Sequence, residues 1–253
     1  DESKLEAALK ANPEAVLVAF VHAETSTGVQ SDAAKLVRLA HDHDCLTIVD
    51  AVTSLAGTPI YVDKWGIDAI YSGSQKCLSA PPGLSPVSFN DRAAEKIRQR
   101  KTRVKSWFLD LSLIMGYWGD NAKRAYHHTA PVNSLYALHE ALVMVQEEGL
   151  ENCWIRHENN HLRLKEGLSS LGITFIVDEQ HRLPQLNAVT IPEGVSDSLV
   201  RGQLLNQFNL EIGAGLGHLA GKVWRIGLMG HASNAKNVDY CINALASVLK
   251  KAA

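Results

Sequence analysis

The sequence has few cysteines, and their spacing is not that of a cysteine-based site. Cys45, Cys77, Cys153 and Cys241 stand far apart, and no two of them form a C-x-x-C pair. Wide spacing of this kind is typical of reduced thiols in an intracellular protein. It argues against a disulfide framework and against a zinc centre.

Long apolar runs and an excess of one charge are also absent. No apolar run approaches the ~20 residues that span a bilayer, and we expect no signal peptide. The formal net charge of −2 and an expected lack of a basic tract argue against nucleic acid or an anionic membrane as the main partner. The final residues, 250–253, are not an S-K-L peroxisomal tail. We therefore expect a cytoplasmic setting, with a peroxisomal one as the alternative for a eukaryotic protein.

The 253 residues, 46% of them hydrophobic, are enough for one large core or two modest domains. In the first part of the chain, apolar runs alternate with segments of helical period. This alternation predicts an α/β fold with a mostly parallel sheet. The expected strands are 15–21, 46–50, 69–72 and 84–89, and the expected helices are 3–11, one capped at 31–32, and 91–99. The strand at 84–89 follows only a short Pro-Pro-Gly turn, so we expect it to be antiparallel.

A long helix over 135–146, closed at Gly149, separates this part from a second one. The second part shows few strands and several amphipathic helices, which predicts a small α+β domain. We therefore place two domains at 1–149 and 150–253. The expected helices of the second are 152–171, 196–207 and 234–250, with strands at 174–177, 188–191 and around Arg225; segment 107–120 is aromatic and is predicted to be irregular.

Two polar side chains follow neighbouring strands at the point where each strand ends. Asp50 ends the apolar run that begins at Cys45, and Lys76 follows Tyr71 within a turn of small residues. Ligands of parallel sheets gather at the carboxyl ends of the strands. A carboxylate and a lysine there suggest an imine-forming lysine with a partner for a pyridinium nitrogen. Taken alone, the two residues are more often a turn former and a solvated surface lysine.

Four motifs occur in the order and spacing of one family: Asp50-Ala51-Val52, Ser72-Gly73-Ser74-Gln75-Lys76, Tyr126-His127-His128-Thr129 and Arg225-Ile226-Gly227. From about Pro13 to about Leu249 the chain resembles the alanine–glyoxylate / serine–pyruvate aminotransferases, pyridoxal-phosphate enzymes of the class V aminotransferase group. The resemblance implies a fold-type-I α/β domain. The relatives carry an N-terminal Ser-Gly-His-type turn for the cofactor phosphate and a stacking aromatic, which this sequence lacks. We therefore expect a C-terminal portion of such an enzyme, without its N-terminal third.

The resemblance also implies which residues would contact pyridoxal phosphate. Lys76 would hold the cofactor as an imine and later move the proton. Asp50 would keep the pyridine nitrogen protonated, and Val52, two residues on and on the same side of the strand, would pack on the ring face. On sequence alone, Val52 is as readily an ordinary core valine.

Gln75 and Thr25 complete the cofactor residues that the resemblance implies within the first domain. In the family, the glutamine before the lysine touches the cofactor phosphate, whereas the similar cysteine desulfurases carry histidine there. Thr25 matches a hydroxyl near the phenolic oxygen of the cofactor. Its ordinary role would be a turn or helix-cap hydrogen bond.

Tyr126 and Thr129 resemble residues that reach the phosphate of the partner subunit's cofactor, which implies an obligatory homodimer. The alternative is a polar interdomain loop. The adjacent His127 and His128 suggest a metal only weakly, because neighbouring side chains point apart in a strand and no third ligand lies at a usual spacing. We therefore expect no metal.

Arg225 lies within an apolar strand, where an arginine is unfavourable unless it meets an anion. The carboxylate of an amino-acid substrate would supply that anion, and the planar guanidinium suits a two-point contact. The alternative is an internal salt bridge. The turn at 213–217 resembles a nucleotide fingerprint, but no helix with its N-terminus at a phosphate follows, so we discard it.

These residues predict pyridoxal-phosphate-dependent transamination, in which the amino group of alanine or serine moves to glyoxylate or pyruvate through Lys76. One alternative is another donor on the same fold, such as 3-hydroxykynurenine. Another is a reaction of the cysteine desulfurase type, although no cysteine stands in an obvious Gly/Ser-rich mobile loop and Cys77 is better explained as a small packing residue. An alternative of another class is an inactive fragment with only a structural role.

Overall fold

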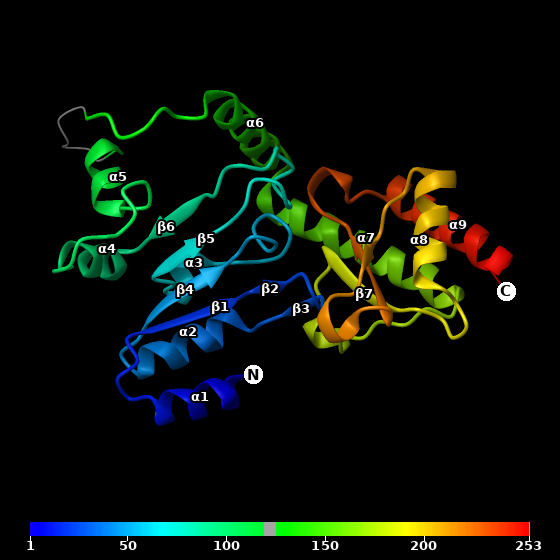
Figure 1. Ribbon diagram of the computed structural model, residues 1–253, viewed down its shortest axis with the longest axis horizontal. Helices are drawn as coiled ribbons and strands as arrows, with labels where there is room; N and C mark the ends of the chain where they lie inside the picture. The colour runs from blue at the N-terminus through cyan, green and yellow to red at the C-terminus, as the bar shows by residue number, and fades with distance from the viewer. Residues whose placement is uncertain (119–124, 253) are drawn as a thin grey trace.

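The first part of the chain is built around a four-stranded sheet with the strand order β1-β4-β5-β6. The structure is a computed structural model that describes residues 1–118 and 125–252 (Figure 1). The strands are β1 (Leu17–Val21), β4 (Leu46–Asp50), β5 (Ala69–Tyr71) and β6 (Val87–Phe89). The first three run parallel, and β6 is antiparallel to β5. The predicted α/β class, the mostly parallel sheet and the antiparallel last strand are therefore confirmed.

Helices cover one face of this sheet (Figure 1). They are α1 (Glu2–Ala11) and α2 (Ala33–Asp42), with the short α3 (Val62–Trp65) beside them. Asp1 and Asp32 begin the two longer helices, because each side chain accepts a hydrogen bond from a first-turn backbone N–H. Val37 of α2 is fully buried and packs in one cluster with Val49 of β4. The first core therefore lies between α2 and the sheet.

The opposite face of the sheet borders a cavity of about 990 Å³. Leu17, Ile48 and Phe89 line it from the strands, and segment 96–112 lines it from the other side through residues 96–104 and 109–112. Two helices flank that segment, α4 (Asp91–Arg98) and α5 (Leu111–Trp118). The segment includes a basic run at 96–105, with six lysines or arginines and no acidic residue. The expectation that the chain has no basic tract is therefore wrong, although acidic residues elsewhere keep the net charge near zero.

Two long helices lead from the first part of the chain to the second. They are α6 (Val132–Glu148) and α7 (Leu150–Ser170). Gly149 alone joins them, and its φ of 87° lies in the left-handed region that favours glycine. On the α6 side, Leu138 and Val145 pack against Cys77 and Leu78, next to the predicted catalytic lysine.

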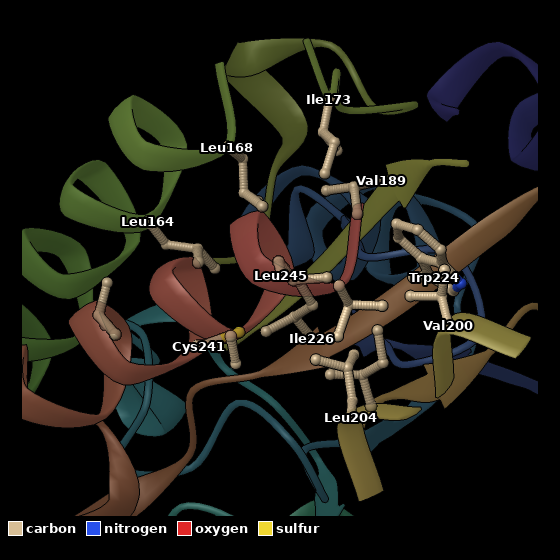
Figure 2. Close-up of a cluster of buried hydrophobic side chains, with 14 of the residues drawn as sticks. Leu164, Leu168, Ile173, Val189, Val200, Leu204, Trp224, Ile226, Cys241 and Leu245 are labelled. Carbon is tan, nitrogen blue, oxygen red and sulfur yellow. The ribbon is translucent and has the colours of Figure 1, made fainter. Parts of the chain in front are cut away.

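The second part contains a small antiparallel sheet with the strand order β7-β9-β8. Its strands are β7 (Leu186–Thr190), β8 (Gly213–Ala214) and β9 (Val223–Gly227). The helices α8 (Asp197–Phe208) and α9 (Ala235–Ala252) pack with α7 around it, and short 3-10 helices lie at Glu179–His181, Gly217–Leu219 and Gly230–Ala232. Figure 2 shows the core between them, where Leu168, Leu204, Trp224 and Leu245 meet from four different elements. Few strands and several helices match the α+β layer predicted for this part.

Two predicted elements differ from the structure. Segment 174–177 is not a strand, because only an isolated bridge joins Phe175 to Val189. Part of segment 107–120 forms α5 rather than irregular chain, while residues 119–120 lie outside the described part. Apolar residues fill most of α5, so it lacks the polar face from which a helical period is recognised.

The two parts of the chain contact each other through small apolar clusters. The hairpin of β2 (Ala23–Glu24) and β3 (Val29–Gln30) places Ala23 against Leu183 and Leu186 of the second part. The backbone N–H of Leu183 donates to the carbonyl of Gly28 at 3.0 Å. The strand ends of the first sheet therefore face residues that follow much later in the sequence.

Candidate active site

The carboxylate of Asp50 is held at the end of β4 by two short hydrogen bonds. Its Oδ2 accepts from the hydroxyl of Tyr71 at 2.7 Å, and its Oδ1 accepts from the backbone N–H of Val52 at 2.9 Å. Tyr71 is the residue directly opposite Asp50 in the parallel register of β4 and β5. The hydrogen bond to Asp50 and, next, burial raise the pKa of Tyr71 to about 12. The carboxylate still has lone pairs for a further donor.

Val52 does not lie on the strand as predicted, because β4 ends at Asp50. The backbone turns at once, and the bond from the Val52 N–H to Asp50 fixes the first residues of that turn. The half-buried Val52 is therefore placed next to Asp50 by a turn, not by strand alternation. The turn continues to Gly57, where a Cβ would lie 2.6 Å from the Sγ of Cys77.

Lys76 stands in a compact turn that follows β5. The hydroxyl of Ser72 donates to the carbonyl of Ala51 at 3.0 Å, which ties the start of the turn to the residue after Asp50. The backbone N–H of Ser79 donates to the carbonyl of Lys76 at 3.0 Å and closes the turn. Lys76 itself is half-buried. The lysine and the carboxylate therefore come from adjacent strand ends on the same edge of the sheet.

Gln75 is exposed and folds back over the start of this turn. A Cβ on Gly73 would lie 2.8 Å from the Oε1 of Gln75, so glycine makes room for that amide. The side chain of Gln75 offers two donors and an acceptor at the surface of the turn.

Arg225 and Thr25 meet although 200 positions separate them. The Nη1 of Arg225 donates to the carbonyl of Thr25 at 3.0 Å, and its Nε donates to the carbonyl of Ala214 at 2.8 Å. Among the residues that the structure describes, no carboxylate pairs with Arg225. The internal salt bridge weighed as an alternative is therefore not seen in this part of the chain. Two neutral carbonyls leave the positive charge available for an anion.

The hairpin that carries Thr25 is joined to the end of β4. The backbone N–H of His22 donates to the carbonyl of Asp50 at 3.0 Å, and Thr25 follows three residues later. The imidazole of His22 is buried and lies edge-on to Trp65. Burial lowers the pKa of His22 to about 4, against a smaller effect of Asp32. These contacts bring Arg225, Thr25 and Asp50 to one edge of the sheet.

Tyr126 and Thr129 lie apart from this cluster in the described contacts. The hydroxyl of Tyr126 forms a hydrogen bond with the Oγ1 of Thr129, and the Tyr126 side chain is 74% exposed. Between them, His127 stacks on Trp107, with ring centroids 4.0 Å apart. Its Nδ1 lies 2.8 Å from the Nδ1 of His128. The argument that adjacent histidines point apart is therefore wrong here, because the segment is not a strand.

The described part of the chain contains no candidate metal site and no candidate membrane span. No group of three or more His, Cys, Asp or Glu side chains there is placed to hold a metal ion. No helix of residues 1–118 and 125–252 has the length and apolar character needed to cross a bilayer.

Comparison with known proteins places the chain. The aminotransferase class-V family model matches residues 1–240. The chain belongs to the class-V aminotransferases. It is 44% identical over 237 residues to the alanine–glyoxylate aminotransferase of Mus musculus, covering 93% of this chain and 57% of the relative. It is 38% identical to the (S)-ureidoglycine–glyoxylate transaminase of Bacillus subtilis, covering 92% and 60%.

A crystal structure of alanine–glyoxylate aminotransferase from Nostoc sp. matches this class-V chain with a TM-score of 0.94. The two are 47% identical, and the match covers 98% of this chain and 65% of that one. The chain therefore spans about three fifths of the length of these relatives. The resemblance identified from the motifs is confirmed at the level of the family.

Membership of the class-V aminotransferases implies pyridoxal phosphate as the cofactor, and the side chains at the strand ends fit it. The half-buried carboxylate of Asp50 suits a protonated ring nitrogen, and the primary amine of Lys76 suits an aldehyde. Gln75 and Thr25 offer hydrogen-bonding groups beside them. The charge of Arg225, which meets only carbonyls among the described residues, suits a carboxylate.

Sequence reasoning about this aminotransferase missed several residues around the site. Tyr71 could have been found, because it ends β5 directly opposite Asp50 once the strands are aligned in parallel. His157, Gly230 and Ser79 could not, because their contacts join distant segments and no short motif contains them.

Proposed function

We propose that the protein transfers the amino group of a small amino acid, alanine or serine, to glyoxylate or pyruvate with the aid of pyridoxal phosphate. The observation that carries this proposal is the juxtaposition of Asp50 and Lys76 at adjacent strand ends, with Arg225 brought to the same edge through Thr25. The names of the relatives from Mus musculus and Nostoc sp. support glyoxylate as an acceptor.

Each residue has a distinct role in this proposal. When bound, pyridoxal phosphate would supply an aldehyde for the amine and a ring that accepts electrons. Asp50 would hold a proton at the ring nitrogen. Its carboxylate is already oriented, because Val52 N–H and the Tyr71 hydroxyl each donate to one of its oxygens. The amine of Lys76 would hold the cofactor and then move the proton at the substrate Cα. Arg225 would bind the substrate carboxylate and orient the Cα toward Lys76.

The remaining predicted contacts belong to the same proposal. Val52 would pack on the ring, Gln75 would contact the phosphate, and Thr25 would lie near the phenolic oxygen. We further propose a homodimer in which Tyr126 and Thr129 reach the partner's cofactor. The strong exposure of Tyr126 supports that assignment, because an exposed side chain can contact a second copy of the chain.

The domain organisation is proposed at 1–149 and 150–253. Two features support the boundary. The strands of the first sheet all precede residue 90 and those of the second all follow residue 185. Gly149 separates α6 from α7 with a backbone conformation that breaks the helix.

A second candidate function keeps the acceptor and changes the donor. The (S)-ureidoglycine–glyoxylate transaminase is 38% identical to this chain, so a donor of that kind fits the same site residues. A desulfurase-type reaction is less well supported, because all four cysteines are buried and none is presented to a substrate. Parallel assays of alanine, serine and (S)-ureidoglycine with glyoxylate would rank the donors.

The deciding experiment is chemical trapping of the lysine. The full-length protein is incubated with pyridoxal phosphate, reduced with borohydride, digested and mapped by mass spectrometry. A phosphopyridoxyl group on the peptide that contains Lys76 is expected, with none there in Lys76→Ala. Lys64→Ala, which removes an exposed lysine of α3, is the matched control and should leave the adduct in place. An adduct only at other lysines would contradict the assignment of Lys76.

A further inference from the structure

The turn that carries Lys76 ends in an unusual backbone conformation. Ser79 has a φ of 60°, in the left-handed region that residues other than glycine rarely adopt. Such conformations persist only where the surrounding structure enforces them, and they gather at functional sites. The turn's own bonds, from Ser79 N–H to Lys76 and from Ala80 N–H to Ser74, do not by themselves account for this strain.

The restraint on Ser79 comes from the other part of the chain. Its Oγ accepts a hydrogen bond from the backbone N–H of His231 at 2.8 Å. The preceding Gly230 also has a positive φ, of 56°, and has no space for a side chain. A Cβ there would lie 1.9 Å from the Oγ of Ser79 and 2.7 Å from the carbonyl oxygen of Cys77. The two backbones therefore meet directly, next to Lys76.

Gly230 is in turn fixed to α7 by two consecutive side chains. The Nε2 of His157 accepts from the N–H of Gly230 at 2.9 Å, while the Nδ1 of His157 donates to the carbonyl of Cys153 at 2.6 Å. The Nη1 of Arg156 donates to the carbonyl of Gly230 at 2.7 Å. Both nitrogens of the buried imidazole are thus engaged, and its tautomer is set by the Cys153 carbonyl.

The turn has space into which it could shift if these contacts were lost. A cavity of about 280 Å³ lies between the turn and the two long helices. Cys77 and Ser79 line it on one side, Ala141 of α6 and Arg156 of α7 on the other. The packing of Leu138 and Val145 against Cys77 and Leu78 therefore leaves open space beside the turn.

We propose that four residues form a latch that positions Lys76 from the second part of the chain: His157, Gly230, His231 and Ser79. In this proposal the latch acts by holding the Lys76 turn in one place relative to Asp50. That the latch positions Lys76 for reaction rests on the proposed function. That the latch restrains the Lys76 turn does not depend on the proposed function.

Hydrogen exchange of the Ser79 and Ala80 amides tests the latch, because those two N–H groups make the turn's own bonds. His157→Leu removes the acceptor for Gly230, and we expect exchange of these amides at least tenfold faster in the full-length protein. His157→Gln retains an acceptor at the same distance along the side chain and should restore much of the protection. His161→Leu is the matched control, since His161 is also buried one turn further along α7 but bonds to Asn187.

Borohydride trapping in the same variants then separates the latch from the proposed function. We expect the rate of adduct formation at Lys76 to fall about tenfold in His157→Leu and to stay near the parent rate in His161→Leu. Equal exchange in the parent and both leucine variants would overturn the latch. Faster exchange with an unchanged trapping rate would overturn its positioning of Lys76. A parent protein with no adduct at Lys76 would refute the proposed function, and exchange alone would then decide whether the latch holds the turn.

Discussion

At the scale of single residues, Asp50 shows how one carboxylate is oriented before any ligand arrives. One oxygen is bound by the turn that follows β4, and the other is bound by the hydroxyl of Tyr71 from the neighbouring strand. The two bonds fix the plane of the carboxylate, which is what an interaction with a flat ring requires. Asp50 therefore supplies the carboxylate, while Val52 and Tyr71 orient it.

Tyr71→Phe should separate these two contributions. The change removes the O–H that bonds Asp50 but keeps the ring, so the carboxylate stays in place and becomes freer to rotate. We expect kcat/KM for amino transfer to fall less than tenfold and the free energy of unfolding to change by no more than about 1 kcal/mol, since the pair is exposed. Tyr61→Phe, on a similarly exposed tyrosine, is the control. A loss above a hundredfold would place the hydroxyl of Tyr71 in the chemistry itself.

Arg225→Lys tests the carboxylate contact at the same scale. Lysine keeps the positive charge but loses the planar fork and the bond to Thr25. We expect the apparent affinity for the amino donor to weaken by about 1.5–3 kcal/mol, with a smaller effect on kcat. Arg201→Lys, in a pair with Asp197 on α8, should leave it unchanged. An identical apparent affinity in Arg225→Lys and the parent for every donor would remove Arg225 from the site.

At the scale of elements, a buried carboxylate joins the strands and helices of the first part. Asp68 is fully buried and accepts hydrogen bonds from Thr47 of β4, His41 of α2 and Asn90 at the start of α4. Burial alone would raise the pKa of Asp68, but these bonds and the charge of Arg92 outweigh it and hold that pKa below its usual range. The charged form is therefore the stabilising one.

Asp68→Asn should destabilise the protein in a pH-dependent way. The amide brings two N–H groups among existing donors, so we expect a loss of about 2–4 kcal/mol at pH 7. Because the folded pKa is lowered, the stabilisation is present above pH ~4 and is lost as the pH falls through the folded value. Urea unfolding at pH 7 and pH 3 should show the difference between parent and variant shrinking in acid. Asp63→Asn, on exposed α3, should show no such difference.

The same scale shows where sequence patterns succeed and where they fail. Buried strands such as β4 and capped helices such as α2 have local sequence patterns that predict them, so both could be predicted from the sequence alone. The strand expected at 174–177 is wrong because its pairing with β7 is too short to make a strand: the bonds from Ile176 N–H to Ala188 and from Thr190 N–H to Thr174 form only a single bridge around Phe175. Asp50 and Lys76 were found because Asp50 ends β4 and Lys76 lies in the short turn that follows β5. The latch was not, because Ser79 and His231 are 152 positions apart.

At the scale of the whole molecule, burial lowers the pKa of three histidines. They are His22, beside the first sheet, and His157 and His161 on α7, and burial is the first cause of the lowered pKa of each. At His157 the charge of Arg156 lowers the pKa further, while the Cys153 carbonyl and Glu148 oppose it. Unfolding would release all three imidazoles into water, where their ordinary pKa is about 6.5.

Stability should therefore fall as the pH drops below that value. Because the pKa values in the folded state are lowered, the contribution of these histidines to the free energy of unfolding is fully present above pH ~6.5. Below that pH the contribution is lost, because the unfolded chain binds more protons than the folded one. For His22, with a pKa of about 4, the loss reaches about 3 kcal/mol at pH 4. Urea unfolding between pH 7 and pH 4 should show this slope, and His22→Phe should flatten it. A slope identical in the parent and His22→Phe would contradict the pKa assigned to His22.

Because Ser79 contacts Gly230 and His231, the surroundings of Lys76 depend on residues that lie far away in the sequence. A chromophore attached to Lys76 would respond to whether residues 230–231 contact Ser79, because loss of that contact would free the turn that carries the lysine. The absorption spectrum of that chromophore would then report whether the Lys76 turn and residues 230–231 are packed together. Substitutions remote from the lysine could be screened by colour alone, with no enzyme assay.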